Sequence, residues 1–247
     1  MANKNGTLSA LLGLIRPSHA LMVFLVVVFL TGRWDIAIAP ALACAFAFVD
    51  NDIQDWQVDR INQRDRPIAQ GKLSLRTAKN INLLLFVLSL VLSLVHPLSV
   101  FTNIFLLSFS LLYNRFLKYL PLLGNIFVAF TMAVPFLYAS LFSQQGYWTI
   151  AIIVFIFGLG REIIKDYEDR EGDRAAGART LAVLLGDAAL WIGRGLVLAA
   201  ALFYILLGHW EGVLALPLII LKPRQFRRVS LVVMVLILLI FFFQNRF

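Results

Sequence analysis

Long apolar runs separated by short connections dominate this 247-residue sequence and constrain its fold more than any other feature. A helix needs about 20 apolar residues to cross a bilayer, and a mean hydropathy of +0.83 is far above that of a soluble domain. Allowing for short or interrupted runs, we count about nine such segments. They are Leu8–Leu30, Ile36–Val49, Thr77–Val95, Leu98–Tyr113, Leu122–Phe142, Trp148–Ile164, Ala188–Leu207, Trp210–Leu221 and Val229–Phe243.

These segments predict an all-α integral membrane protein with about nine transmembrane helices. The eighth segment, residues 210–221, is too short to span comfortably, so we expect it to be tilted, half-buried or joined to the ninth. The chain has neither a linker rich in Gly, Pro or Ser nor a low-complexity tail. We therefore expect residues 1–247 to form a single membrane domain.

The basic residues, which give a net charge of +8, lie where a membrane topology would place them. If the N-terminus is cytoplasmic, the N-terminal segment and the even-numbered connections hold all but two of the 22 Lys and Arg residues, the exceptions being Arg33 and Arg246. An excess of Lys and Arg marks cytoplasmic loops. We expect a multi-pass protein of the cell membrane, in contact with lipids, and no nucleic-acid partner or obligate protein partner.

Two triplets of aspartate occur at the ends of apolar segments with the same spacing. Residues at i, i+3 and i+7 share one face of a helix. The second triplet follows the first by 114 residues, from position 52 to position 166, which suggests duplicated halves around a central cavity. The triplets are Asp52, Asp55 and Asp59, and Asp166, Asp169 and Asp173.

Three carboxylates on one helical face repel one another unless cations neutralise them. Mg²⁺ is held in proteins by few carboxylates together with substrate phosphate oxygens, so the triplets predict a magnesium-bound diphosphate. Both are followed by charged connections, and we expect two cytoplasmic cap loops at about 50–76 and 161–187. By the topology above, both triplets then face the cytoplasm.

The composition also suits the cleavage of an allylic diphosphate. Mg²⁺ and basic side chains stabilise the charge that develops on the leaving diphosphate, and aromatic faces stabilise an allylic carbocation. The chain supplies acids flanked by cations, together with 21 Phe, 6 Tyr and 5 Trp. We therefore expect prenyl transfer, with the lipid chain in an apolar tunnel.

Both acidic motifs resemble those of a known family. The stretch NDIQDWQVD (residues 51–59) is similar to the NDxxDxxxD motif of the UbiA superfamily of intramembrane prenyltransferases, and DREGD (169–173) is similar to its DxxxD motif. Arg16-Pro17 resembles the opening of the family, and the stretch 62–74 resembles the sequence after its first motif. The resemblance implies nine helices around a central cavity, with a cytoplasmic cap.

The resemblance also implies roles for individual residues. It implies that Asp52, Asp55, Asp169 and Asp173 are catalytic ligands of Mg²⁺ and diphosphate, supported by Asp59 and Asp166 as further metal ligands. It adds Asn51, and Lys118 after Tyr113, to the substrate-binding residues. An anionic acceptor would need its own cations, and position along the chain adds candidates for substrate binding: Arg16, His19, Arg66, Lys72, Arg161 and Lys165.

The acceptor is suggested by local similarity. The stretches 160–173 and 113–125 resemble the branch of the family that makes archaeal ether lipids. That branch moves a geranylgeranyl group from its diphosphate to the hydroxyl of a prenylated glyceryl phosphate. The alternative is an aromatic acceptor, as in quinone biosynthesis; we see no feature that supports a porphyrin-type acceptor.

A secondary transporter or cation channel is a more remote alternative. Such proteins use acids within the membrane, commonly at midplane depth beside broken helices. In this sequence the acids cluster at one end of the apolar segments, and the opposite connections are almost uncharged. This pattern favours an enzyme.

Overall fold

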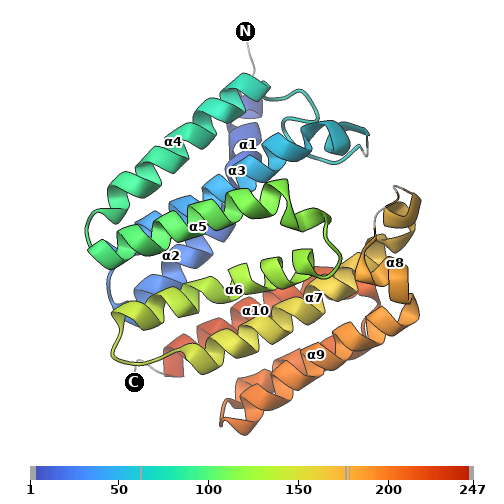
Figure 1. Cartoon of the computed structure of the whole chain (residues 1–247). Helices are drawn as coiled ribbons and strands as arrows, with labels where there is room; N and C mark the ends of the chain where they lie inside the picture. The colour runs from blue at the N-terminus through green and yellow to red at the C-terminus, as the bar shows by residue number, and fades with distance from the viewer. Residues whose placement is uncertain (1–3, 62, 176, 178, 245–247) are drawn as a thin grey trace. The chain divides into compact units, whose positions relative to one another are not determined.

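The computed structural model describes residues 4–61, 63–175, 177 and 179–244. Arg246, one of the two basic residues expected outside the cytoplasmic regions, lies outside these described residues. The chain divides into two compact units, Met1–Phe116 and Leu117–Phe247, and each is described by itself. Both consist of helices and connections in the described residues (Figure 1).

The first unit is organised around one long helix, α3. This helix contacts each of the other four helices of the unit, and α4 also contacts α5 (Figure 1). Its central position follows from its small residues, since Ala39, Ala41, Ala43 and Ala45 are all buried. The five helices are α1 (Lys4–Ile15), α2 (Pro17–Thr31), α3 (Ile38–Ile61), α4 (Leu75–Ser93) and α5 (Pro97–Arg115).

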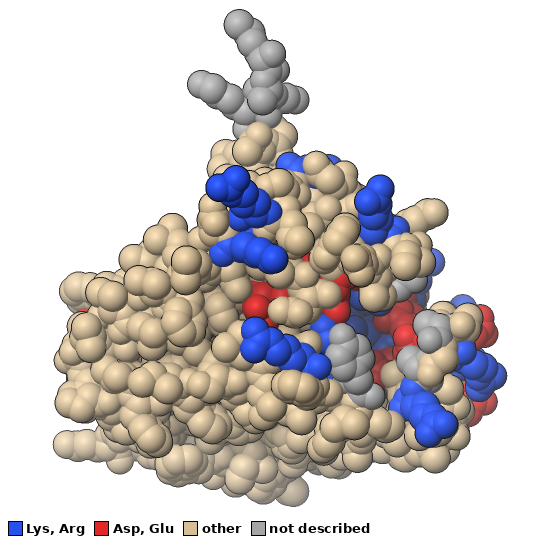
Figure 2. Space-filling view, turned by 45° about the horizontal axis from the view of Figure 1, so that its top comes forward, with Lys and Arg blue, Asp and Glu red and all other residues tan. Residues whose placement is uncertain are grey.

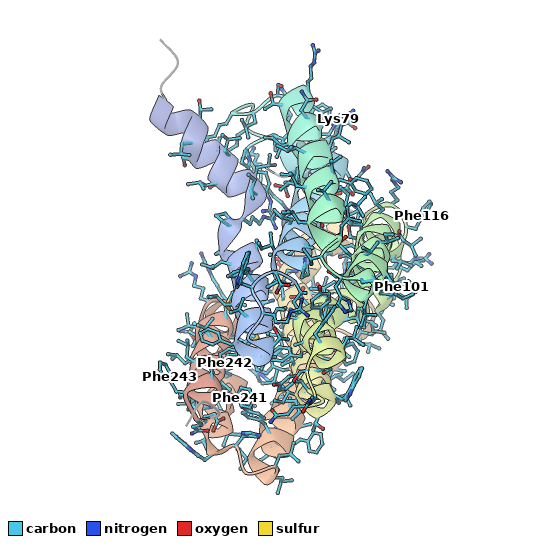
Figure 3. All side chains as sticks on the ribbon, turned by 90° about the vertical axis from the view of Figure 1, so that its left-hand side faces the viewer. Lys79, Phe101, Phe116, Phe241, Phe242 and Phe243 are labelled. Atoms are coloured by element: carbon cyan, nitrogen blue, oxygen red, sulfur yellow. The ribbon has the colours of Figure 1, made fainter. Side chains whose placement is uncertain are left out.

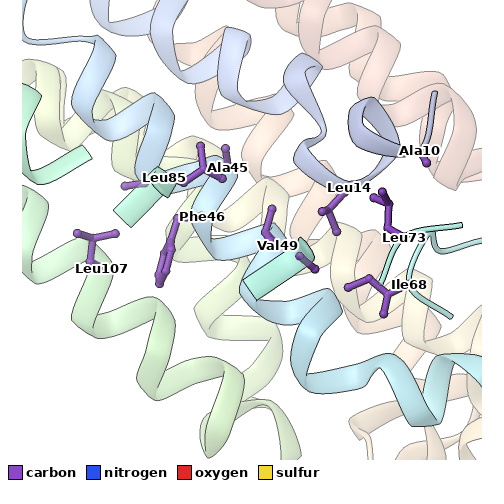
Figure 4. Packing of buried hydrophobic residues seen from close by; sticks show 11 residues of the cluster. Ala10, Leu14, Ala45, Phe46, Val49, Ile68, Leu73, Leu85 and Leu107 are labelled. Carbon is purple, nitrogen blue, oxygen red and sulfur yellow. The ribbon is translucent and has the colours of Figure 1, made fainter. Parts of the chain in front are cut away.

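The core of this unit joins α3 to the connection between α3 and α4. Phe46 and Val49 of α3 belong to one buried cluster with Leu14 of α1, and the same cluster contains Ile68 and Leu73 of the connection (Figure 4). A side-chain carbon added to Gly13 would lie 3.2 Å from Pro67 Cγ, so α1 packs closely on the connection. The first expected cap segment is therefore anchored by α1.

The ends of the helices follow local sequence signals. Ser74 caps α4, because its Oγ accepts a 3.0 Å hydrogen bond from the Thr77 backbone N–H. Pro97 occupies the first turn of α5, where a missing N–H costs least. Arg16 separates α1 from α2 in a left-handed conformation (φ 51°) just before Pro17, and the two helices are bent by 48°.

The second unit is organised around α7. This helix contacts α6, α8, α9 and α10, and η2 contacts α9 and α10 (Figure 1). Close approach of α7 and α9 depends on glycine, because a side-chain carbon added to Gly160 would lie 2.6 Å from the Gly193 carbonyl oxygen. The elements are η1 (Leu117–Tyr119), α6 (Leu123–Phe142), α7 (Trp148–Ala175), α8 (Leu181–Leu185), α9 (Asp187–Leu206), η2 (Trp210–Ile220) and α10 (Pro223–Gln244).

Both units share an internal plan. The long helices α3 and α7 end at Ile61 and Ala175, and these positions are again 114 residues apart. Each long helix contacts the helix before it and at least two that follow it within its own unit. This correspondence agrees with the duplication suggested by the acidic triplets. The expected central cavity and the single domain of residues 1–247 stay predictions.

The all-helical membrane architecture is confirmed, but the expected number of nine spans is not. Among the described residues, five helices are long and apolar enough to cross a membrane, or six if α1 and α2 form one bent span. Both α3 and α7 carry charged residues in their C-terminal parts, which lowers their apolar length. The short eighth segment forms η2, a 3₁₀ helix of 11 residues.

The surface is consistent with a lipid environment. Phe101 on α5 and Phe243 on α10 are 72% and 68% exposed, and both project from their helices (Figure 3). Lys79, by contrast, extends from the first part of α4, close to the charged connection that precedes it (Figure 3). Basic and acidic side chains occur together in Figure 2, beside broad areas that carry neither.

Candidate functional site

The first acidic motif lies on the C-terminal part of α3, so its residues share a helical face as predicted. Asp52 is 1% exposed and Asp59 is 4% exposed, whereas Asn51 and Asp55 are half-buried. The expected cap segment 50–76 is thus helical as far as Ile61, non-helical from residue 63 to Ser74, and helical again from Leu75, where α4 begins. Negative charges near the C-terminus of a helix interact unfavourably with the helix dipole, so this motif needs nearby cations.

Two arginines that are distant in sequence supply these cations to Asp52. Arg16 Nη2 donates a 2.6 Å hydrogen bond to Asp52 Oδ1, and Arg66 Nε lies 3.9 Å from the same oxygen. Burial raises the pKa of the Asp52 carboxyl, and the charges of Arg16 and Arg66 oppose that rise. The second carboxylate oxygen, Oδ2, is buried without a hydrogen-bond partner. Asp52 therefore keeps one oxygen for a further ligand.

The break between α1 and α2 positions Arg16. Its guanidinium lies 4.5 Å from the centre of the Phe48 ring on α3, and the ring of His19 packs edge-on against Phe48 at 4.8 Å. The two N-terminal residues predicted to bind substrate, Arg16 and His19, are therefore both held against α3, one turn before Asp52.

Two further cations of the first unit, of which only Lys72 was predicted to bind substrate, are placed differently. Arg64 Nε lies 3.7 Å from Asp59 Oδ1, and Lys72 Nζ lies 3.9 Å from Asp65 Oδ1 in the connection. Lys72 and Asp65 are both largely exposed. The structure thus pairs Arg16, Arg64 and Arg66 with the motif, whereas Lys72 pairs with an acid outside it.

Sequence reasoning missed a buried acid in the same helix. Asp50 is 4% exposed and accepts a 2.8 Å hydrogen bond from Asn114 Nδ2 of α5 and a 3.4 Å bond from Asn82 Nδ2 of α4. It lies beside Asn51 but outside the i, i+3, i+7 pattern, so spacing alone did not reveal it. Polar residues within the apolar runs of α4 and α5 were the available signal.

The second acidic motif occupies the corresponding part of α7. Asp166 Oδ2 accepts a 2.8 Å hydrogen bond from Asn125 Nδ2, near the start of α6. Burial raises the pKa of Asp166 to about 6, and the hydrogen bond from Asn125 opposes this rise. Arg227 Nη1 of α10 lies 3.7 Å from Asp169 Oδ1, and Asp173 is half-buried one turn further along α7.

The predicted cations before this motif bind a neighbouring acid. Arg161 Nη1 lies 2.5 Å from Glu162 Oε1, and Lys165 Nζ lies 2.7 Å from Glu162 Oε2. Glu162 is only 4% exposed, so Arg161 and Lys165 together neutralise it.

Lys118 lies in η1, just before the start of α6, the helix that carries Asn125. A side-chain carbon added to Gly124 would lie 3.5 Å from the Lys118 carbonyl oxygen, and the next residue, Asn125, binds Asp166. The sequence assigned no role to Asn125 or Arg227. Asn125 was visible only as part of the 113–125 stretch, and Arg227 only as one of the basic residues expected on the cytoplasmic side.

An apolar groove lies between α6 and α7 within the second unit. It is an open groove of about 280 Å³ lined by apolar side chains, among them Phe130, Trp148 and Phe155. Such a surface accepts a hydrocarbon chain of a lipid. The groove identifies three of the aromatic residues that could contact such a chain.

The acids fit Mg²⁺ as a partial ligand set. Among the described residues, no group of three or more His, Cys, Asp or Glu side chains is placed to hold a metal ion by itself. Mg²⁺ commonly takes one or two carboxylates and fills its remaining positions with water and phosphate oxygens. The unpartnered Oδ2 of Asp52 is a donor of this kind.

The geometry and the sequence agree with one family. Residues 6–246 match the sequence profile of the UbiA prenyltransferase family. The chain belongs to this family, and its apolar helices are those of a multi-pass membrane protein.

Individual relatives carry a more specific name. The chain is 38% identical over 169 residues to the digeranylgeranylglyceryl phosphate synthase of Sulfolobus acidocaldarius. This alignment covers 66% of this chain and 61% of that protein. It is 36% identical over 196 residues to the protein of the same name from Methanobrevibacter smithii, with 70% and 68% covered. The match thus spans less than two thirds of the Sulfolobus relative.

Solved structures share the fold. A structure described as digeranylgeranylglyceryl phosphate synthase has a TM-score of 0.72 at 25% identity, with 96% of this chain and 97% of that chain covered. A UbiA homologue from Archaeoglobus fulgidus, bound to GPP and Mg²⁺, has a TM-score of 0.65 at 20% identity and covers 88% of this chain and 86% of its own. The predicted UbiA-like fold is thereby confirmed.

Proposed function

We propose that this protein transfers a prenyl group, in particular geranylgeranyl, from its diphosphate to the free hydroxyl of a prenylated glyceryl phosphate. The names of its relatives support this reaction of ether-lipid synthesis. The observation that carries the proposal is the environment of Asp52. This buried carboxylate is bound through one oxygen by Arg16, approached by Arg66, and left with its other oxygen unpartnered.

Such an arrangement suits an anionic substrate that binds to the protein through a metal ion. A buried acid that served only to pair with arginine would commonly have both oxygens satisfied. Asp52 can instead bind a cation through Oδ2 while Arg16 and Arg66 remain beside it to contact phosphate oxygens. We propose that Asp169, with Asp166 and Asp173 on the same face of α7, plays the equivalent part in the second motif.

Magnesium, when bound, would neutralise the diphosphate and stabilise it as a leaving group. Each motif would hold magnesium separately: Asp52, Asp55 and Asp59 in the first motif, supported by Asn51, and Asp166, Asp169 and Asp173 in the second. Arg16 and Arg66 orient phosphate oxygens and stabilise the negative charge that grows on the leaving diphosphate as the allylic C–O bond breaks. The C–O electron pair leaves with the diphosphate, the acceptor hydroxyl oxygen bonds to the allylic carbon, and the hydroxyl proton is lost.

The acceptor carries a phosphate of its own and therefore needs further cations. We propose His19, which packs against Phe48 of α3, and Lys118, in η1 just before α6, as candidates. Lys72, Arg161 and Lys165 already bind carboxylates within their own units, so they would serve through charge more than through direct contact. We place the N-terminus and both motifs on the cytoplasmic side of the cell membrane, following the distribution of basic residues.

A product assay tests the proposal. The full chain, purified in detergent, is incubated with Mg²⁺, radiolabelled geranylgeranyl diphosphate and two competing kinds of acceptor: geranylgeranylglyceryl phosphate and a panel of aromatic acids. A doubly prenylated glyceryl phosphate is the expected product, and its formation should stop with EDTA and resume with excess Mg²⁺. A prenylated aromatic acid would instead assign the protein to quinone biosynthesis.

A third outcome would reject prenyl transfer altogether. If no pyrophosphate is released from geranylgeranyl diphosphate with any acceptor, the enzyme proposal fails and a transport function becomes the better reading. The acids of both motifs then would have to bind a transported ion.

A further inference from the structure

Arg227 contacts the second acidic motif, although it lies on a helix that carries neither of the two motifs. It lies near the start of α10, which contacts α7. Its neighbour Phe226 is 1% exposed and Ser230 is fully buried, so this turn of α10 is anchored in the second unit. Arg227 Nη1 lies 3.7 Å from Glu168 Oε2 and 3.7 Å from Asp169 Oδ1. One guanidinium therefore serves two carboxylates.

These contacts are ion pairs without hydrogen bonds. A separation of 3.7 Å exceeds the usual 2.7–3.2 Å for N–H···O, and Glu168 Oε2 is buried with no hydrogen-bond partner. The Arg227 side chain is 45% exposed. In the first unit, by contrast, Arg16 is 17% exposed and bonds Asp52 at 2.6 Å. Arg227 thus neutralises its acids while remaining able to move.

We propose that Arg227 is a charge latch on the second acidic motif: it holds Asp169 and Glu168 while no cation is bound and is released to a substrate phosphate when a divalent cation takes Asp169. The proposal rests on the proposed function, because it takes Asp169 as a metal ligand. A divalent cation and a guanidinium repel each other across a shared carboxylate. The released guanidinium offers up to five N–H donors, in a geometry that suits phosphate oxygens.

The latch makes a prediction about metal binding that needs no turnover. If Arg227 competes with the metal for Asp169, its removal should tighten binding of Mn²⁺, used as a spectroscopic probe for Mg²⁺. Two unit charges about 4 Å apart in a water-like medium interact by roughly 1 kcal/mol, which corresponds to about fivefold in affinity. The Kd of Mn²⁺ for the full chain in detergent, measured by EPR titration without substrate, should therefore fall about fivefold in R227Q.

A matched control is the next residue on the same helix. Arg228 is exposed, carries the same charge and has no contact with Glu168 or Asp169 in the described residues. R228Q should change the Kd of Mn²⁺ by less than about twofold, because an exposed charge without a partner is screened by salt. R227M, which keeps the aliphatic length, serves in place of R227Q if the latter does not fold.

A second titration tests the release to phosphate. With Mn²⁺ at saturation, inorganic pyrophosphate should bind several-fold more weakly to R227Q than to the wild-type protein and R228Q. Mn²⁺ affinity that is unchanged or weaker in R227Q, or equal effects in R227Q and R228Q, would overturn the latch. If the wild-type protein forms no prenylated product and yet shows these binding shifts, the proposed function fails and the latch stands.

Discussion

The Asp50 carboxylate and the Asn114 amide form a 2.8 Å hydrogen bond that joins α3 to α5 beside the first acidic motif. Both side chains are nearly inaccessible, at 4% and 3% exposure. Asn114 Nδ2 also lies 3.3 Å from the Ala47 carbonyl oxygen, so its amide bridges one turn of α3. The bond fixes the rotation of α3 at the turn from which Asn51 and Asp52 project.

The first prediction concerns this bond. Replacing Asn114 with Ala leaves a buried carboxylate with one weak partner, and an unsatisfied buried polar group costs about 1–3 kcal/mol. Thermal unfolding of N114A in detergent should therefore begin at a lower temperature than that of the wild-type protein. N80A, which changes an exposed asparagine of α4, should unfold like the wild type. Equal stability of N114A and N80A would show that the bond contributes little.

The second prediction concerns Arg16. Because its guanidinium binds Asp52 at 2.6 Å and is the better placed of the two arginines, R16Q should lower kcat/KM for the prenyl diphosphate by at least about tenfold. R76Q removes an equal charge from an exposed position in the first turn of α4 and should matter little. Steady-state kinetics with labelled diphosphate measure both, and a similar loss in R76Q would mean that net charge alone is responsible.

The third prediction concerns the two acidic motifs. D52N and D169N keep the size of each side chain and remove one metal ligand, so each should abolish turnover while the protein still inserts into the membrane. D65N changes an acid of the first connection that is 89% exposed, and it should retain activity. Product formation by membranes containing each variant tests this. Turnover in D52N or D169N close to the wild-type rate would reject the metal-ligand assignment.

The fourth prediction uses two glycines of α9. A side-chain carbon added to Gly193 would lie 2.7 Å from Ile164 Cγ1 and 2.9 Å from the Gly160 carbonyl oxygen, so G193A should force α7 and α9 apart and cost about 1–3 kcal/mol. Gly195 has nothing within 4 Å of such a carbon, and G195A should stabilise the helix by up to about 1 kcal/mol. We expect the melting temperature to fall in G193A and to rise in G195A, relative to the wild-type protein. Equal shifts in the two variants would contradict the packing argument.

Patterns with local causes were predictable from the sequence. The apolar runs predicted helices because, within a bilayer, a single segment can hydrogen-bond all of its own backbone polar groups only as a helix. The spacing of Asp52, Asp55 and Asp59 predicted one helical face, and α3 continues through Ile61 as this requires. The same reasoning held for the second motif on α7. The count of nine spans was not confirmed, because apolar length alone does not show where a run breaks or becomes a 3₁₀ helix such as η2.

Partners distant in sequence were not predictable. Arg66 and Lys72 were both predicted to bind substrate. Of these two residues only Arg66 lies near Asp52, whereas Lys72 pairs with Asp65. Neither Asn125 nor Arg227 had a signal that linked it to an acid. Such pairings depend on how helices are rotated against one another, and no local pattern encodes that rotation.

The sequence by itself therefore determined the helical membrane fold, the two acidic faces and the resemblance to prenyltransferases, because hydropathy, helical period and motif spacing act over short stretches of chain. The tertiary structure alone decided which cation neutralises which carboxylate. Arg16 reaches Asp52 because a left-handed residue breaks the helix pair α1–α2, and Arg227 reaches Asp169 because α10 packs on α7. Electrostatic partnership follows distance in space, and that distance is set by helix packing.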